Sequence, residues 1–115
     1  IEVLTRFRRA LPRASCVLMG PGDFPKEAPG GFIPRPRLVE LIEIQREVAP
    51  EFNCGFWDTY RFMGGEGSMQ RWVQAVPRMA QPDHIHLSAR GYVKVGMALA
   101  DALMRAYDAF MLTPR

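Results

Sequence analysis

The stretch SCVLMGPG at residues 15–22 is a short apolar run that ends in a loop of glycine and proline. A run of this length, bounded by such residues, is typical of a buried β-strand. A second run, FNCGFW at residues 52–57, has the same character, and residues 38–48 between them have the pattern of an amphipathic helix. Because apolar strands that alternate with helices indicate a parallel sheet, we expect an α/β fold.

Helical patterns continue on both sides of these strands. We expect a helix at residues 1–10 and a long irregular loop at residues 20–36. Ser68 and Ser88 are suited to cap two further helices, the second of which covers residues 89–110. The apolar stripe of this last helix, which we expect in the core, is Tyr92, Val95, Leu99, Leu103, Ala106 and Phe110. Two parallel strands do not make an independent sheet, so the pattern predicts part of a larger α/β domain.

The composition narrows the possible partners. The chain has 115 residues, of which 48% are hydrophobic and 23% charged, and its net charge is +3. No apolar stretch is long enough to span a membrane. The densest basic cluster, at residues 6–13, has no recognisable nucleic-acid-binding motif, so we expect a solvated helix face and no nucleic-acid partner. Cys16 and Cys54 lie in apolar runs, and we expect both to be buried free thiols.

The chain's two histidines, His84 and His86, lie in the segment PDHIHLS at residues 82–88. Asp83 stands three residues before His86, on a loop that enters a helix. Its carboxylate can fold back onto the imidazole, accept a hydrogen bond from Nδ1–H and stabilise the imidazolium. Nε2 is then free to take a proton from a nucleophile. We therefore predict that Asp83 orients His86 and that His86 is a general base.

Two other readings of the same segment are open. Asp83 can simply cap a turn while His86 packs or hydrogen-bonds locally. Alternatively, Asp83, His84 and His86 can ligate a metal in a metal-dependent hydrolase, since His-x-His places two imidazoles on one side of an extended segment. His84 itself is expected to be exposed or to donate a local hydrogen bond.

The wider context resembles the SGNH/GDSL hydrolase family. The features that match are the strand at residues 16–21, the strand end at residues 56–58 and the block DHIHLSARGY at residues 83–92. The stretch MGGEGSM at residues 63–69 is similar to a loop in members that deacetylate cell-envelope carbohydrate. The resemblance implies the C-terminal half of a flavodoxin-like three-layer α/β/α domain. It also implies a serine esterase that removes small acyl groups, such as acetyl, from carbohydrate, without a cofactor and in an extracytoplasmic, bacterial setting.

The family's other motifs are absent from this sequence. There is no Gly-Asp-Ser, which carries the nucleophile, and no Gly-x-Asn-Asp, which supplies oxyanion donors. We therefore expect residues 1–115 to be the C-terminal part of a single SGNH-type domain. The N-terminal part, with the serine, is then missing or on another chain and is the partner of this one. The remaining alternative is a non-catalytic interaction module.

Overall fold

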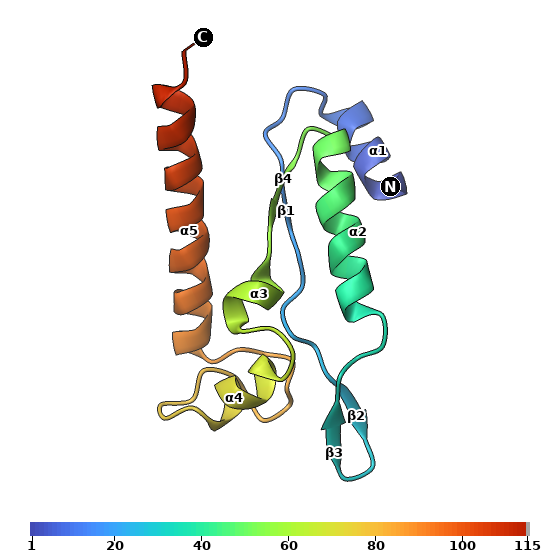
Figure 1. The fold of residues 1–115 in the computed structure, drawn as a ribbon, viewed down its shortest axis with the longest axis vertical. Coiled ribbons are helices and arrows are strands. Elements are labelled where there is room, and N and C mark those ends of the chain that lie inside the picture. The colour runs from blue at the N-terminus through green and yellow to red at the C-terminus, as the bar shows by residue number, and fades with distance from the viewer. Residues whose placement is uncertain (115) are drawn as a thin grey trace. The chain divides into compact units, whose positions relative to one another are not determined.

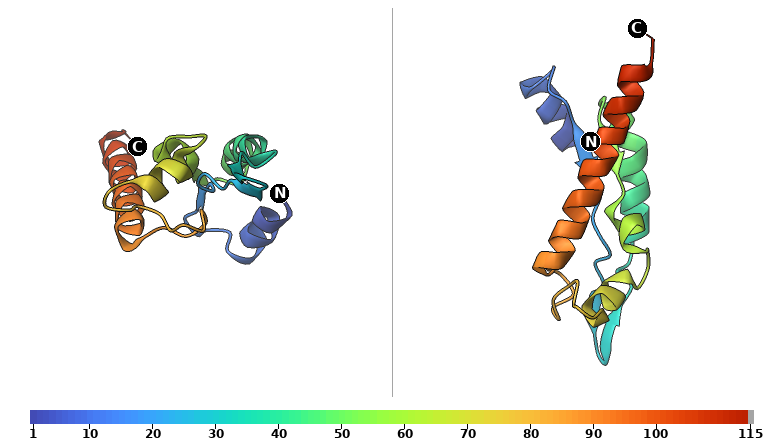
Figure 2. Two further views of the ribbon diagram at one scale, coloured as in Figure 1. Left: turned by 90° about the horizontal axis from the view of Figure 1, so that it is seen from below. Right: turned by 90° about the vertical axis from the view of Figure 1, so that its left-hand side faces the viewer.

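A computed structural model of the chain describes residues 1–114 (Figure 1; Figure 2). The chain divides into two compact units, residues 1–68 and the segment from Met69 onward. The elements in chain order are α1 (Glu2–Ala10), β1 (Val17–Met19), β2 (Lys26–Ala28), β3 (Gly31–Ile33), α2 (Leu38–Glu51), β4 (Gly55–Trp57), α3 (Thr59–Met63), α4 (Ser68–Gln74) and α5 (Ala89–Leu112). No helix within residues 1–114 is both long and apolar enough to cross a membrane.

The first unit is built on a parallel pair of strands. β1 lies beside β4, with Val17 opposite Gly55 and Met19 opposite Trp57. α2 precedes β4 in the chain and packs against both strands (Figure 1). The buried side chains of α2 are Leu38, Ile42 and Ala49. This arrangement of strand, helix and parallel strand confirms the predicted α/β class.

The prediction of free thiols is wrong, because Cys16 and Cys54 are joined by a disulfide. The register places Val17 opposite Gly55, so the residues just before them also face each other, with Cα atoms 4.6 Å apart. At the same point the Gly55 N–H donates to the Cys16 carbonyl (2.9 Å). The pairing follows from the register of two segments 38 residues apart, which the pattern of apolar residues does not reveal.

The loop expected at residues 20–36 contains an antiparallel hairpin formed by β2 and β3, with Lys26 opposite Ile33. Pro29 and Gly30 connect its strands, and Gly30 has a φ of 86°, a conformation that glycine adopts without steric penalty. Each strand has only three residues. Since they are so short and the first is largely charged, no apolar run marks them in the sequence.

The second predicted strand is shorter than expected because α2 continues through Pro50 to Glu51. Phe52 and Asn53 form the turn into β4, and their N–H groups donate to carbonyls in the last turn of α2 (3.1 and 2.9 Å). Arg8 of α1 donates to the carbonyls of Phe52 (2.6 Å) and Asn53 (2.8 Å). Arg8 therefore fastens α1 to this turn, whereas we expected the whole basic cluster to be a solvated face.

The caps of the last two helices differ from each other. Ser88 caps α5 as predicted, since its Oγ accepts a hydrogen bond from the Gly91 N–H (3.1 Å). The prediction for Ser68 is wrong. It is the first residue of α4, and its hydroxyl is buried without a hydrogen-bond partner, so its side chain caps nothing.

The apolar stripe of α5 is not the buried core that we expected. Val95 is buried, but Tyr92 is 54% exposed and Phe110 57% exposed. Within the described part of the second unit, no other helix or strand packs extensively on α5. Most of the stripe is therefore exposed: Tyr92, Leu103, Ala106 and Phe110 are exposed, Leu99 is half-buried and only Val95 of the stripe is buried.

Candidate active site

The loop between α4 and α5, residues 75–88, is held largely by its own backbone. At the end of α4 the Trp72 carbonyl accepts a hydrogen bond from the Met79 N–H (2.9 Å). Further along, the Gln81 N–H donates to the His86 carbonyl (2.8 Å), which ties the two limbs of the loop together. The α4–α5 loop is thus an ordered support for the side chains that it carries.

The first turn of α5 packs closely against this loop. The Ser88 N–H donates to the Met79 carbonyl (2.9 Å), and the Ser88 Oγ donates to the Arg78 carbonyl (2.8 Å). A Cβ atom added at Gly91 would stand 2.0 Å from the Met79 carbonyl oxygen, far inside a normal contact. Only glycine fits at this position, so Gly91 lets the helix approach the backbone of the loop.

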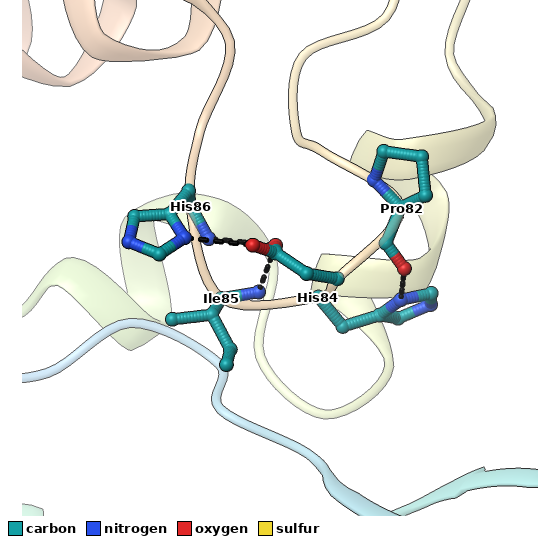
Figure 3. Close-up of polar contacts among 5 residues, drawn as sticks. Pro82, His84, Ile85 and His86 are labelled. Carbon is teal, nitrogen blue, oxygen red and sulfur yellow. Dashed lines mark hydrogen bonds and ion pairs between the residues drawn. The ribbon is translucent and has the colours of Figure 1, made fainter.

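The loop brings Asp83 and His86 together as predicted. The His86 Nδ1 lies 2.7 Å from Asp83 Oδ2. The other carboxylate oxygen, Oδ1, accepts from the N–H groups of Ile85 (2.9 Å) and His86 (3.0 Å). Figure 3 shows the His86 ring and the Ile85 N–H turned toward the same carboxylate. Asp83 therefore caps a turn and binds the imidazole at once, so the turn-capping reading and the catalytic reading are compatible.

These contacts favour the charged carboxylate. The hydrogen bond from His86, followed by those from the two backbone N–H groups, lowers the pKa of Asp83 to about 2. Asp83 is thus ionised at neutral pH and accepts a hydrogen bond from the Nδ1–H of His86. That proton position leaves Nε2 as the basic nitrogen of a neutral ring, and the His86 side chain is 67% exposed. This arrangement can accept a proton from a hydroxyl group placed beside it.

His84 lies differently from His86. It is only 7% exposed, its Nδ1 lies 2.8 Å from the Pro82 carbonyl oxygen, and its Nε2 contacts Oε1 of Gln70 on α4. Its φ is 59°, in the left-handed region. Of the two outcomes that we expected for His84, exposure or a local hydrogen bond, the structure shows the local hydrogen bond. We expected no role for Gln70, and for His84 only a local hydrogen bond or, in the alternative reading, metal binding. The one available signal for its place in the turn was that histidine tolerates positive φ better than most residues.

The geometry does not match the metal-site reading of this segment. Because His84 has a left-handed backbone, the segment is not extended, and the rings of His84 and His86 lie on different sides of the loop in Figure 3. Within residues 1–114 no three His, Cys, Asp or Glu side chains are grouped so that they could hold a metal ion.

A second acidic residue, Asp58, follows β4 and has a structural role. Its Oδ1 accepts from the Arg61 N–H (2.8 Å), which caps α3, and its Oδ2 contacts the Arg46 guanidinium. Arg46 also lies over the ring of Phe56, with its guanidinium carbon 4.9 Å from the ring centroid. These contacts join α2, β4 and α3 within the first unit.

Comparison with known proteins finds a solved structure that has a similar fold. No protein-family model matches the sequence, and no curated protein matches it. A solved structure described as "Peptidoglycan O-acetylesterase in action, 5 min" matches with a TM-score of 0.80 and 30% sequence identity, over 94% of this chain and 31% of that one. The chain has the fold of part of an SGNH-type hydrolase domain. The predicted resemblance and the predicted fold class are thereby confirmed.

The match covers only part of the solved structure. The chain spans about a third of the length of the protein that it matches, since it covers 31% of that structure. The chain therefore matches a fragment of an SGNH-type hydrolase domain.

Proposed function

We propose that this chain supplies the Asp–His half of the catalytic triad of a serine ester hydrolase. The observation that carries the proposal is the contact of 2.7 Å between His86 Nδ1 and Asp83 Oδ2, on an ordered loop of an SGNH-type fold. In this role Asp83 holds the tautomer of His86 that leaves Nε2 basic. His86 is the general base.

The reaction follows from this geometry. His86 Nε2 takes the proton of a serine hydroxyl as the serine oxygen attacks the ester carbonyl carbon, and Asp83 stabilises the imidazolium that results. The imidazolium then protonates the alcohol oxygen as the bond from the acyl carbon to that oxygen breaks. This step leaves an acyl-serine, which water hydrolyses by the same proton transfers in reverse. No cofactor takes part.

The nucleophile belongs to a different part of the domain. Ser88 caps α5, and the hydroxyl of Ser68 is buried. Ser15 precedes β1, at the amino end of the parallel pair, whereas reactive loops of such sheets follow the carboxyl ends. We therefore assign the serine and the oxyanion donors to an N-terminal part of the same domain, either joined to this chain or on a separate one.

The surface of the first unit supports such a partner. Val17 and Met19 of β1 and Leu41 and Ile44 of α2 are each close to half exposed, although all are apolar. A two-stranded parallel sheet also leaves edges that further strands can pair with. The missing part of the domain would extend this sheet and cover these side chains.

The substrate that we propose is an acetyl ester on cell-envelope carbohydrate. Two observations support it: the matched protein is described as a peptidoglycan O-acetylesterase, and residues 63–69 resemble a loop of carbohydrate deacetylases. The disulfide between Cys16 and Cys54 fits an extracytoplasmic location, because disulfides persist in oxidising compartments.

The test uses the complete protein that contains this chain, with p-nitrophenyl acetate and O-acetylated glycan as substrates. We expect His86→Ala to lower kcat/KM by about 1,000-fold or more, because the general base is lost. Gln81→Ala, an exposed side chain of the same loop, is the control and should retain full activity. Thermal melting verifies that each variant is folded. A folded His86→Ala protein as active as the parent would refute the assignment, and a parent without hydrolysis would favour an interaction module.

A further inference from the structure

His84 lies between the two residues of the proposed dyad in sequence, and the geometry of the loop depends on its conformation. Asp83 Oδ1 accepts hydrogen bonds from the N–H groups of Ile85 and His86. This is possible only if the chain turns sharply directly after Asp83. His84 makes that turn with a φ of 59°, in the left-handed region that is sterically unfavourable for a residue with a side chain. Contacts of the imidazole must offset this penalty.

Those contacts join the turn to a helix. The His84 ring is buried. Its Nδ1 contacts the Pro82 carbonyl, and its Nε2 contacts the Gln70 side chain on α4. The His84 N–H also donates to the Gln81 carbonyl (3.1 Å). One side chain thus connects α4 to the centre of the α4–α5 loop, directly beside the carboxylate that binds His86.

We propose that His84, held by Gln70, is a positioning residue for the Asp83–His86 dyad. The proposal rests on the function proposed above and deepens it. His84 takes no part in proton transfer and touches no substrate, because its ring is buried and faces α4. It keeps Asp83 Oδ2 within hydrogen-bond distance of His86 Nδ1 by fixing the turn that places both side chains. The residue with a left-handed backbone in this loop is therefore a histidine because its ring makes the contacts that hold the turn.

Two substitutions separate the ring contacts from the backbone conformation. His84→Ala removes the ring and disfavours the positive φ, whereas His84→Asn tolerates a positive φ but is too short to replace both ring contacts. Gln70→Ala leaves His84 in place and removes only its partner on α4. Because Gln70 is an exposed helical residue, this variant tests the proposal even if His84→Ala does not fold.

In the complete protein we expect His84→Ala to lower kcat by about 100-fold with little change in KM, since an error of about 1 Å in a catalytic group has that effect. Gln70→Ala should lower kcat less, by about tenfold, and His84→Asn should fall between the two. In each variant the pH profile of kcat/KM should also differ from that of the parent, because the contact between the carboxylate and the imidazole is then weaker.

NMR of 15N-histidine-labelled protein gives a readout that is independent of turnover. The Nδ1 proton of His86 should resonate at low field in the parent and in Gln81→Ala, and should broaden or shift upfield in Gln70→Ala and His84→Ala. Folded variants with parental kcat, pH profile and His86 resonance would overturn the proposal. If His86→Ala retained activity, the proposed function would fail instead, and the NMR comparison would still decide whether His84 positions the pair.

Discussion

The α4–α5 loop and the parallel sheet of the first unit are held together in different ways. In the loop, every hydrogen-bond partner of the Asp83 carboxylate lies within three residues of it. In the sheet, β1 and β4 are joined across 38 residues by the pair Cys16 and Cys54, and Val17 and Met19 of β1 are still close to half exposed. The geometry of the candidate site is therefore local, whereas the sheet depends on distant segments. Changes in the loop should affect catalysis, and changes in the sheet should affect stability.

The largest effect should follow from Asp83→Asn in the complete protein. The Asn Oδ1 atom can still accept from the Ile85 and His86 N–H groups, so the turn should persist. Its NH₂ group, however, faces His86 Nδ1 and favours the tautomer that protonates Nε2. We expect kcat to fall by about 1,000- to 10,000-fold while the melting temperature hardly changes, as steady-state kinetics and calorimetry can measure. A loss of less than tenfold would mean that the dyad does not act in the reaction.

The sheet should show the opposite pattern when its disulfide is removed. Replacing both Cys16 and Cys54 by alanine opens a loop of 38 residues, which should lower the free energy of unfolding by about 4 kcal/mol. The activity of the molecules that remain folded should stay close to that of the parent. Denaturant unfolding measures the loss, and the reduced parent protein should match the double variant. Equal stability with and without the bond would contradict this account of the sheet.

The same contrast explains what could be predicted from the sequence. The hydrogen bond between Asp83 and His86 and the cap of Ser88 on α5 were predictable, because partners within three residues are brought together by the local chain. The disulfide was not, because it requires the register of β1 and β4.

His84 falls between these cases. Its contact with Pro82 is local, but its ring also contacts Gln70, fourteen residues earlier on α4. A pattern of residue types contains no information on that contact. The apolar stripe of α5 was misread for a related reason, since periodicity predicts which face is apolar and not what covers it.

A smaller effect should distinguish two glycines of α5. Gly91→Ala brings a Cβ atom to 2.0 Å from the Met79 carbonyl oxygen, so the helix and the loop must separate. We expect a loss of about 2–3 kcal/mol in unfolding free energy, together with reduced kcat because the loop carries the dyad. Gly96→Ala is the matched control. No atom lies within 4 Å of its added Cβ, and the helix should become more stable by up to about 1 kcal/mol. Equal effects at both positions would show that the helix does not pack against the loop.

The smallest effect concerns acid stability. Hydrogen bonds from His86 and two backbone N–H groups lower the pKa of Asp83 to about 2, from an ordinary value of 3.8. Because the folded pKa lies below the unfolded one, the stabilisation from this carboxylate is complete above about pH 4 and is lost as the pH falls toward 2. Asp83→Asn lacks this titration, so its unfolding midpoint should fall less steeply than the parent's between pH 4 and pH 2. The contribution is modest, since the carboxylate is solvent-accessible. If the two curves ran parallel, this prediction would be wrong. The pKa of Asp83 would then be lowered equally in the unfolded chain, because only contacts that folding creates can make the two proteins differ.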